Sequence, residues 1–136
     1  MSSKKQKEML LVRKEFGIKR VFRSCKYSIE GLKYAYRNEQ SMWLHAISLC
    51  FIIPLGFLLQ ISFIQWALVI LSSLFILSIE LLNTAIEATV DMVTKEFNNY
   101  AKIAKDCGSA AAFVASFAHM AICFFVFGEK ILEFLG

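Results

Sequence analysis

The sequence predicts an all-α integral membrane protein, with three transmembrane helices preceded by an amphipathic helix at the membrane surface. Hydrophobic residues make up 57% of the 136 residues, more than the core of a soluble domain of this size requires. One proline and six glycines leave few positions at which helices would break. Between Gln40 and Ile79 there is no Asp, Glu, Lys or Arg, so this stretch can cross a bilayer core.

The positive charge lies mostly at the N-terminal side of the apolar segments. Eleven of the fifteen Lys and Arg residues precede Gln40. Beside long apolar segments, such a region is expected to face anionic lipid headgroups on the cytoplasmic side, and no nucleic-acid partner is expected. We expect residues 1–18 to be a basic extension and residues 19–136 to be one membrane domain.

The surface helix is expected over residues 20–38. Its apolar positions recur at helical spacing, and charged side chains occupy much of the other face. A first crossing is expected over residues 42–59, with Pro54 inside it, and residues 60–65 form a tight turn without charge.

A second helix is expected over residues 63–93, longer than the roughly 20 residues that one crossing needs. Residues 94–105 are polar and are expected to return the chain to the basic side. The third crossing follows over residues 106–126, where several alanines offer small faces for close helix packing. Three crossings place the N-terminus in the cytoplasm and the C-terminus outside.

A row of polar residues follows the apolar part of the second predicted helix. Its steps of three, four and four return to one helix face, and its members are Glu80, Asn83, Glu87 and Asp91. Eleven apolar or hydroxyl residues (69–79) directly precede Glu80, and a carboxylate at membrane depth is costly, which favours a functional role for it. Asp91, Glu96 and Asp106, taken singly, are explained equally well as ordinary charges at helix ends.

The predicted topology brings further charged residues to the membrane face where this row ends. Glu39 precedes the first crossing, Lys105 and Asp106 begin the third, and Arg20 lies on the surface helix. Carboxylates suit Mg²⁺, which takes a few carboxylates together with phosphate oxygens, and a cationic side chain balances phosphate charge. A carboxylate at the apolar boundary can accept a proton from an alcohol.

Other site chemistries have little support in the sequence. The four cysteines have no C-x-x-C spacing, and neither a P-loop nor a dinucleotide-binding glycine motif is present. His45 and His119 lie singly in apolar stretches, where contact between helices is the more ordinary role than metal binding.

Three blocks of the sequence resemble the prokaryotic diacylglycerol kinase family, small trimeric membrane enzymes that include undecaprenol kinases. The blocks are G-L-K-Y-A-Y-R-N-E (31–39), E-L-L-N-T-A-I-E-A-T-V-D (80–91) and A-K-D-C-G-S-A-A (104–111). They follow one another in order and with spacing similar to that of the family. The resemblance implies a homotrimer in the bacterial inner membrane, multi-pass, with active sites shared between neighbouring subunits at the cytoplasmic face.

The resemblance also implies roles for individual residues. Glu80 falls at the catalytic base that deprotonates the lipid hydroxyl, and Glu39 and Glu87 fall at the carboxylates that hold Mg²⁺ against ATP. The residues implied in ATP binding are Arg20, Tyr27, Glu39, Glu87, Glu96, Asn98, Lys105 and Asp106. The residues implied in binding the lipid alcohol are Arg20, Glu80, Asn83 and Ser109.

The motifs leave the lipid substrate divided between two classes. Gly108-Ser109 resembles the diacylglycerol kinases of Gram-negative bacteria, whereas N-E-x-x-M-x-x-H (38–45) is closer to undecaprenol kinases. We predict an ATP- and Mg²⁺-dependent lipid kinase of phospholipid biosynthesis that converts diacylglycerol to phosphatidic acid. The alternative is an undecaprenol kinase that makes undecaprenyl phosphate.

A non-enzymatic membrane carrier or assembly protein is an alternative of another class. In such a protein the acidic row would line a path across the bilayer. The distribution of charge opposes a path of this kind, because the outer half of each predicted crossing has no ionisable residue apart from histidine.

Overall fold

The computed structural model describes residues 17–135 and confirms the all-α class. No strand occurs in that range, and the helices are α2 (Ile18–Asn38), α3 (Gln40–Leu58), α4 (Phe63–Val93) and α5 (Asn99–Leu135). The last three are long and apolar enough to cross a membrane, as predicted. The expected basic extension lies, up to residue 16, outside the described residues.

The chain divides into two compact units, residues 1–34 and 35–136. In the first unit, α2 is amphipathic, as predicted. Its apolar side chains Val21, Phe22 and Ile29 are exposed, and Lys26 and Glu30 on another face approach to 3.9 Å. An amphipathic helix whose apolar face is not covered by protein is typical of the membrane surface, and that location stays a prediction.

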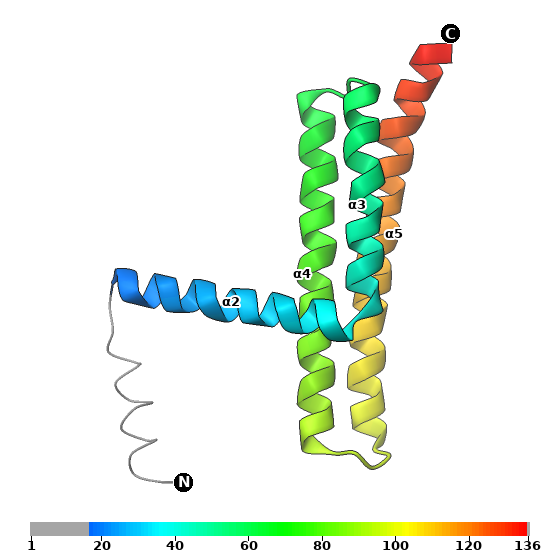
Figure 1. Cartoon of the computed structure of the whole chain (residues 1–136). Coiled ribbons are helices and arrows are strands. Elements are labelled where there is room, and N and C mark those ends of the chain that lie inside the picture. The colour runs from blue at the N-terminus through cyan, green and yellow to red at the C-terminus, as the bar shows by residue number, and fades with distance from the viewer. Residues whose placement is uncertain (1–16, 136) are drawn as a thin grey trace. The chain divides into compact units, whose positions relative to one another are not determined.

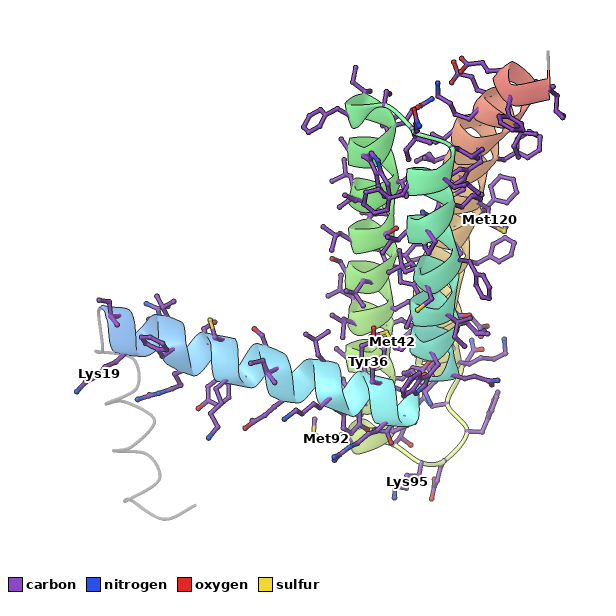
Figure 2. The ribbon with its side chains drawn as sticks, turned by 45° about the horizontal axis from the view of Figure 1, so that its top comes forward. Lys19, Tyr36, Met42, Met92, Lys95 and Met120 are labelled. Carbon is purple, nitrogen blue, oxygen red and sulfur yellow. The ribbon has the colours of Figure 1, made fainter. Side chains whose placement is uncertain are left out.

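The second unit contains the three predicted crossings as antiparallel neighbours (Figure 1). Most of the contacts between helices join α4 to α5, and α3 packs less extensively against α4. Both α4 and α5 continue past the start of α3, so only these two helices form the end of the bundle at the α4–α5 loop (Figure 1). Figure 2 shows Met92 and Lys95 at this end, which is called the loop end below.

Small residues allow α5 to pack closely on α4. Gly108, Ala112 and Ala115 are buried on one face of α5, where the backbones can approach. The sequence predicted an alanine face here. Ala112 and Ala115 confirm it, whereas Ala110, Ala111 and Ala118 stay exposed because they point away from α4.

The α3–α4 turn is fixed by a capping box and by a small apolar cluster. Ser62 Oγ accepts a hydrogen bond from the Gln65 amide (3.3 Å), and the Ser62 amide donates to Gln65 Oε1 (2.8 Å). Gln60, with φ of 51°, adopts the left-handed conformation that reverses the chain. The buried cluster beneath the turn consists of Ile61, Val69, Val126 and Phe127.

The third long helix begins earlier than the sequence predicted. Asn98 Oδ1 accepts hydrogen bonds from the amides of Tyr100 (2.9 Å) and Ala101 (3.2 Å), so α5 starts at Asn99. The expectation that residues 94–105 form a polar connection was therefore wrong for all but its first five residues. Hydropathy locates the apolar part of a helix, whereas the cap decides where the helix begins.

The surface of the three long helices is apolar. Only 11% to 28% of the most apolar window of each helix is buried within the chain. Phe51, Phe113 and Phe124 are each more than 70% exposed. With 31 residues, α4 is roughly 46 Å long and exceeds the roughly 30 Å hydrocarbon core. This surface and this length fit a protein surrounded by lipid, with α4 extending beyond the hydrocarbon.

Gly56 provides a test of the α3–α4 packing. A Cβ at this position would lie 2.7 Å from two ring carbons of Trp66, so Gly56→Ala must displace the indole. We expect a loss of about 1–3 kcal/mol and a Tm in detergent micelles lower by several degrees. Gly128→Ala in α5 is the matched control, because its new Cβ would meet nothing within 4 Å. Equal Tm values for the two variants would contradict this account of the turn.

Candidate active site

Glu80 lies on α4 and contacts the first turn of α3. The Ser41 hydroxyl donates a hydrogen bond of 2.9 Å to Glu80 Oε2, and the carboxylate is partly buried. Oε1 has no hydrogen-bond partner among residues 17–135. A carboxylate anchored through one oxygen has a defined orientation, and its second oxygen can meet a ligand.

Glu39 and Glu87 lie beside Glu80. Glu39 is the N-cap residue of α3, yet its side chain makes no capping hydrogen bond. Partial burial, followed by the negative charges of Glu87 and Glu80, raises the pKa of the Glu39 carboxyl above its ordinary value. The three carboxylates therefore repel one another, and a bound cation would relieve that repulsion.

Asn83 supports this group from a buried position against α5. Its Nδ2 donates a 3.1 Å hydrogen bond to Glu87 Oε1, one helical turn away. Its Oδ1 is buried without a hydrogen-bond partner in the described part of the chain. A Cβ on Gly108 would collide with this oxygen, so the glycine gives Asn83 its place.

One ion pair joins α4 to α5 at the loop end, and a second lies within α5. Lys105 Nζ on α5 lies 2.6 Å from Asp91 Oδ1 on α4, and Lys102 Nζ lies 2.5 Å from Asp106 Oδ2. These side chains are well exposed, so the pairs add little stability. The pair with Asp91 holds the ammonium group of Lys105 between α4 and α5.

A polar cavity of about 320 Å³ lies at the loop end between α4, the loop and α5. Its volume falls within the usual range for small-molecule sites. Four residues predicted to bind the nucleotide line it together with Asp91: Glu96, Asn98, Lys105 and Asp106. Residues that are separate in the sequence thus share one polar cavity.

A second cavity, of about 450 Å³, lies among α3, α4 and α5 and is called the apolar cavity below. Glu80 and Ser41 line it, and from them it extends past Ile76 and Met120 to Ile52 and Cys123. Figure 2 shows Met120 well along α5 from the loop end. Glu80 therefore borders an apolar space, whereas Lys105 borders the polar one.

The structure does not gather every predicted residue. Arg20 and Tyr27 lie in the first unit, seven residues apart on one face of α2, and both are exposed. Their part in the site stays a prediction. Ser109 is exposed on α5, next to Gly108, and lines neither cavity.

The two histidines confirm their predicted role as contacts between helices. His119 Nδ1 lies 2.8 Å from Ser72 Oγ, and His45 Nε2 lies 3.0 Å from the Ser73 carbonyl oxygen. Their ring centroids are 5.8 Å apart in an edge-to-face arrangement. Their meeting was not predicted from the sequence, because it depends on how α3 and α5 are rotated.

The site offers two carboxylates that could bind a cation, and this number fits the ligand preference of Mg²⁺. Within the described range, no group of three or more His, Cys, Asp or Glu side chains is arranged to hold a metal ion. Glu39, whose pKa is raised by burial and by the charge of nearby Glu87, can supply two oxygen ligands together with Glu87. That number suits Mg²⁺, which takes its other ligands from water and substrate phosphates.

Known proteins similar to this chain belong to one family. A model described as prokaryotic diacylglycerol kinase matches residues 26–127. The diacylglycerol kinase of Pseudomonas aeruginosa is 44% identical over 99 residues, 73% of this chain and 80% of that protein. The diacylglycerol kinase of Haemophilus influenzae is 39% identical over 102 residues, 75% and 86% respectively. The undecaprenol kinase of Bacillus subtilis is 34% identical over 114 residues, 84% and 93%. The chain therefore belongs to the prokaryotic diacylglycerol kinase family.

Proposed function

We propose that this membrane lipid kinase transfers the γ-phosphoryl group of ATP, with Mg²⁺, to diacylglycerol and so produces phosphatidic acid. The supporting observation is the position of Glu80, which lines the apolar cavity. Asp91, eleven residues further along the same face of α4, lines the polar cavity together with Lys105. A kinase for a lipid alcohol must bring a hydrophobic substrate and a water-soluble nucleotide to one point.

Glu80 is the general base in this proposal. Ser41 holds Oε2, so Oε1 is the oxygen that accepts the proton of the lipid hydroxyl as this hydroxyl attacks phosphorus. The carboxylate meets an alcohol that enters from the apolar cavity, which also accommodates the hydrocarbon.

The polar cavity binds the nucleotide in this proposal. Lys105 leaves Asp91 to neutralise phosphate charge, while Glu96 and Asn98 in the loop contact the nucleoside. Glu39 and Glu87 hold the metal, and Asn83 orients Glu87. Mg²⁺ held by Glu39 and Glu87 would supply positive charge to neutralise the phosphates. Positioning and charge neutralisation account for most of what a protein contributes to phosphoryl transfer.

The substrate and the assembly are inferred from the relatives and from the sequence. Proteins named diacylglycerol kinase are 39% and 44% identical to this chain, and the protein named undecaprenol kinase is 34% identical. The Gly108-Ser109 pair supports the first class, and undecaprenol remains the alternative substrate. The proposal includes a homotrimer in the bacterial inner membrane, with the loop end on the cytoplasmic side.

A panel of lipids tests the reaction directly. Purified protein in mixed micelles, given radiolabelled ATP and Mg²⁺, is expected to convert diacylglycerol to phosphatidic acid faster than it phosphorylates undecaprenol. The measurement is labelled product resolved by thin-layer chromatography. A faster reaction with undecaprenol would assign the alternative substrate. A folded protein that labels no lipid alcohol would exclude the proposed reaction, and ion flux into liposomes without ATP consumption would favour a carrier.

Glu80→Gln tests the general base. The amide keeps the size of the side chain and can accept the Ser41 hydrogen bond, but it cannot take the proton from the alcohol. We expect kcat to fall by at least about 100-fold, with Tm and oligomeric state unchanged. Glu133→Gln is the control, because Glu133 pairs with Lys130 at the far end of α5. Activity retained in Glu80→Gln would remove Glu80 from this role.

Glu87→Gln tests the metal site. Loss of one of two carboxylate ligands should raise the Mg²⁺ concentration for half-maximal activity by about tenfold or more. Loss of a residue that only hydrogen-bonds to a metal ligand already lowers metal affinity by about that factor. The KM for the lipid should change little, because Glu87 does not line the apolar cavity. Titrations of Mg²⁺ and of lipid with wild type and Glu87→Gln give both values. An unchanged Mg²⁺ requirement would contradict the assignment.

A further inference from the structure

The apolar cavity is lined by several polar side chains besides Glu80, and most of them already have partners. Ser41 donates to Glu80 Oε2, and the Ser48 hydroxyl donates to the His45 carbonyl oxygen (2.8 Å). His45 Nε2 donates to the Ser73 carbonyl oxygen, since a carbonyl can only accept. These groups are committed to the protein.

The polar groups at the deeper end of the cavity are also engaged. His119 Nδ1 lies 2.8 Å from Ser72 Oγ, and Cys123 Sγ lies 3.5 Å from His119 Nε2. Only one polar side chain of the lining has no hydrogen-bond partner within the described part of the chain, and it is Ser116.

The state of Ser116 differs from that of most other hydroxyls in these helices; Ser109, which is exposed, is the other serine of α5 without a hydrogen-bond partner in the described part of the chain. A helical serine or threonine in apolar surroundings usually donates to a carbonyl oxygen three or four residues earlier. Ser48, Ser73, Ser78 and Thr84 all do so, at 2.8–3.0 Å. Ser116 does not, although it is half-buried, and an unpaired hydroxyl in an apolar cavity is unfavourable. Its hydroxyl is therefore available to a ligand.

The register of α4 and α5 gives the depth of Ser116 relative to Glu80. Gly108 faces Asn83, and His119 contacts Ser72, so eleven residues of α5 run beside eleven residues of α4 in the opposite direction. Glu80 thus lies opposite position 111, and Ser116 lies five residues further along α5. Five residues correspond to about 7 Å along the axis.

The side chains reduce this separation. The Cα–Cβ bond of a helical residue tilts toward the N-terminus of its helix. Because α4 and α5 are antiparallel, Glu80 and Ser116 lean toward one another. The cavity thus presents a proton acceptor and, a few ångströms deeper, a hydroxyl donor without a partner.

We propose that Ser116 is a specificity-determining residue that donates a hydrogen bond to an ester carbonyl oxygen of the lipid substrate. This inference rests on the proposed function, in which Glu80 meets the lipid hydroxyl. In diacylglycerol the ester carbonyls lie a few bonds from the free hydroxyl, within the axial separation of about 7 Å between Glu80 and Ser116. The acyl chains then occupy the part of the cavity lined by Ile52, Ile76 and Met120.

The same arrangement disfavours a polyprenol. Undecaprenol continues as hydrocarbon from the carbon that bears its hydroxyl, so it has no acceptor for Ser116. Binding it would leave the Ser116 hydroxyl without a partner against apolar carbon. A site that offers a hydrogen bond selects against an analogue that cannot accept it.

A pair of glycerolipids isolates this interaction. Diacylglycerol and the matching dialkylglycerol share the hydroxyl and the chain length, but the ether lipid has no carbonyl oxygen. We expect wild type to show a kcat/KM about fivefold to tenfold higher for the ester lipid, which corresponds to one hydrogen bond. Ser116→Ala should lose this preference by becoming slower on the ester lipid only. Ser116→Cys, with similar size and a weak donor, should lose most of it.

Ser78→Ala is the matched control, because Ser78 is exposed on α4 and donates to the Leu74 carbonyl oxygen. It should keep the ester preference. Wild type and Ser116→Ala with the same ester-to-ether ratio would overturn the proposal while leaving the kinase reaction intact. An equal loss on both lipids with dissociation of the oligomer would assign Ser116 to a subunit contact and also overturn it. If wild type phosphorylates no lipid, the proposed function itself fails.

Discussion

The organisation of the second unit depends on keeping one carboxylate at an apolar boundary. Glu80 follows a long uncharged stretch of α4 and is held by a hydroxyl from α3, not by a cation. A cationic partner would form an ion pair with the carboxylate and engage its oxygens. The Ser41 hydroxyl instead orients the carboxylate through one oxygen, which suits the general-base role proposed for Glu80.

Close packing of α4 against α5 couples the carboxylate to the loop end. Gly108 admits Asn83 between the helices, and Asn83 in turn binds Glu87. The same register sets Lys105 against Asp91 and His119 against Ser72. The polar cavity and the apolar cavity therefore lie at fixed positions along one rigid pair of helices. For phosphoryl transfer this rigidity is useful, because small errors in position are costly in rate.

The sequence predicted the elements better than the contacts between them. The bounds of α4 were correct because Ser62 is a recognisable cap and the polar row keeps helical spacing to the end. The start of α5 was wrong because the capping role of Asn98 has no signal in hydropathy. The residues predicted to bind the nucleotide came from family motifs, and the structure brings four of the eight to one cavity. Ser41 and Ser116 were missed, since their significance depends on helix rotation and register, which a single sequence does not contain.

The limited packing of α3 fits the proposed substrate. The apolar cavity is lined by α3 on one side and by α5 on the other, and these two helices make few direct contacts. A lipid alcohol reaches its site from within the bilayer, so the site needs an apolar space between helices and not only a cleft open to water. If α3 packed as closely on α5 as α4 does, its side chains would fill the space beside Glu80 and Ser116. No room would then remain for a glycerol backbone. The separation of α3 from α5 is thus as necessary to the proposed reaction as the close approach of α4.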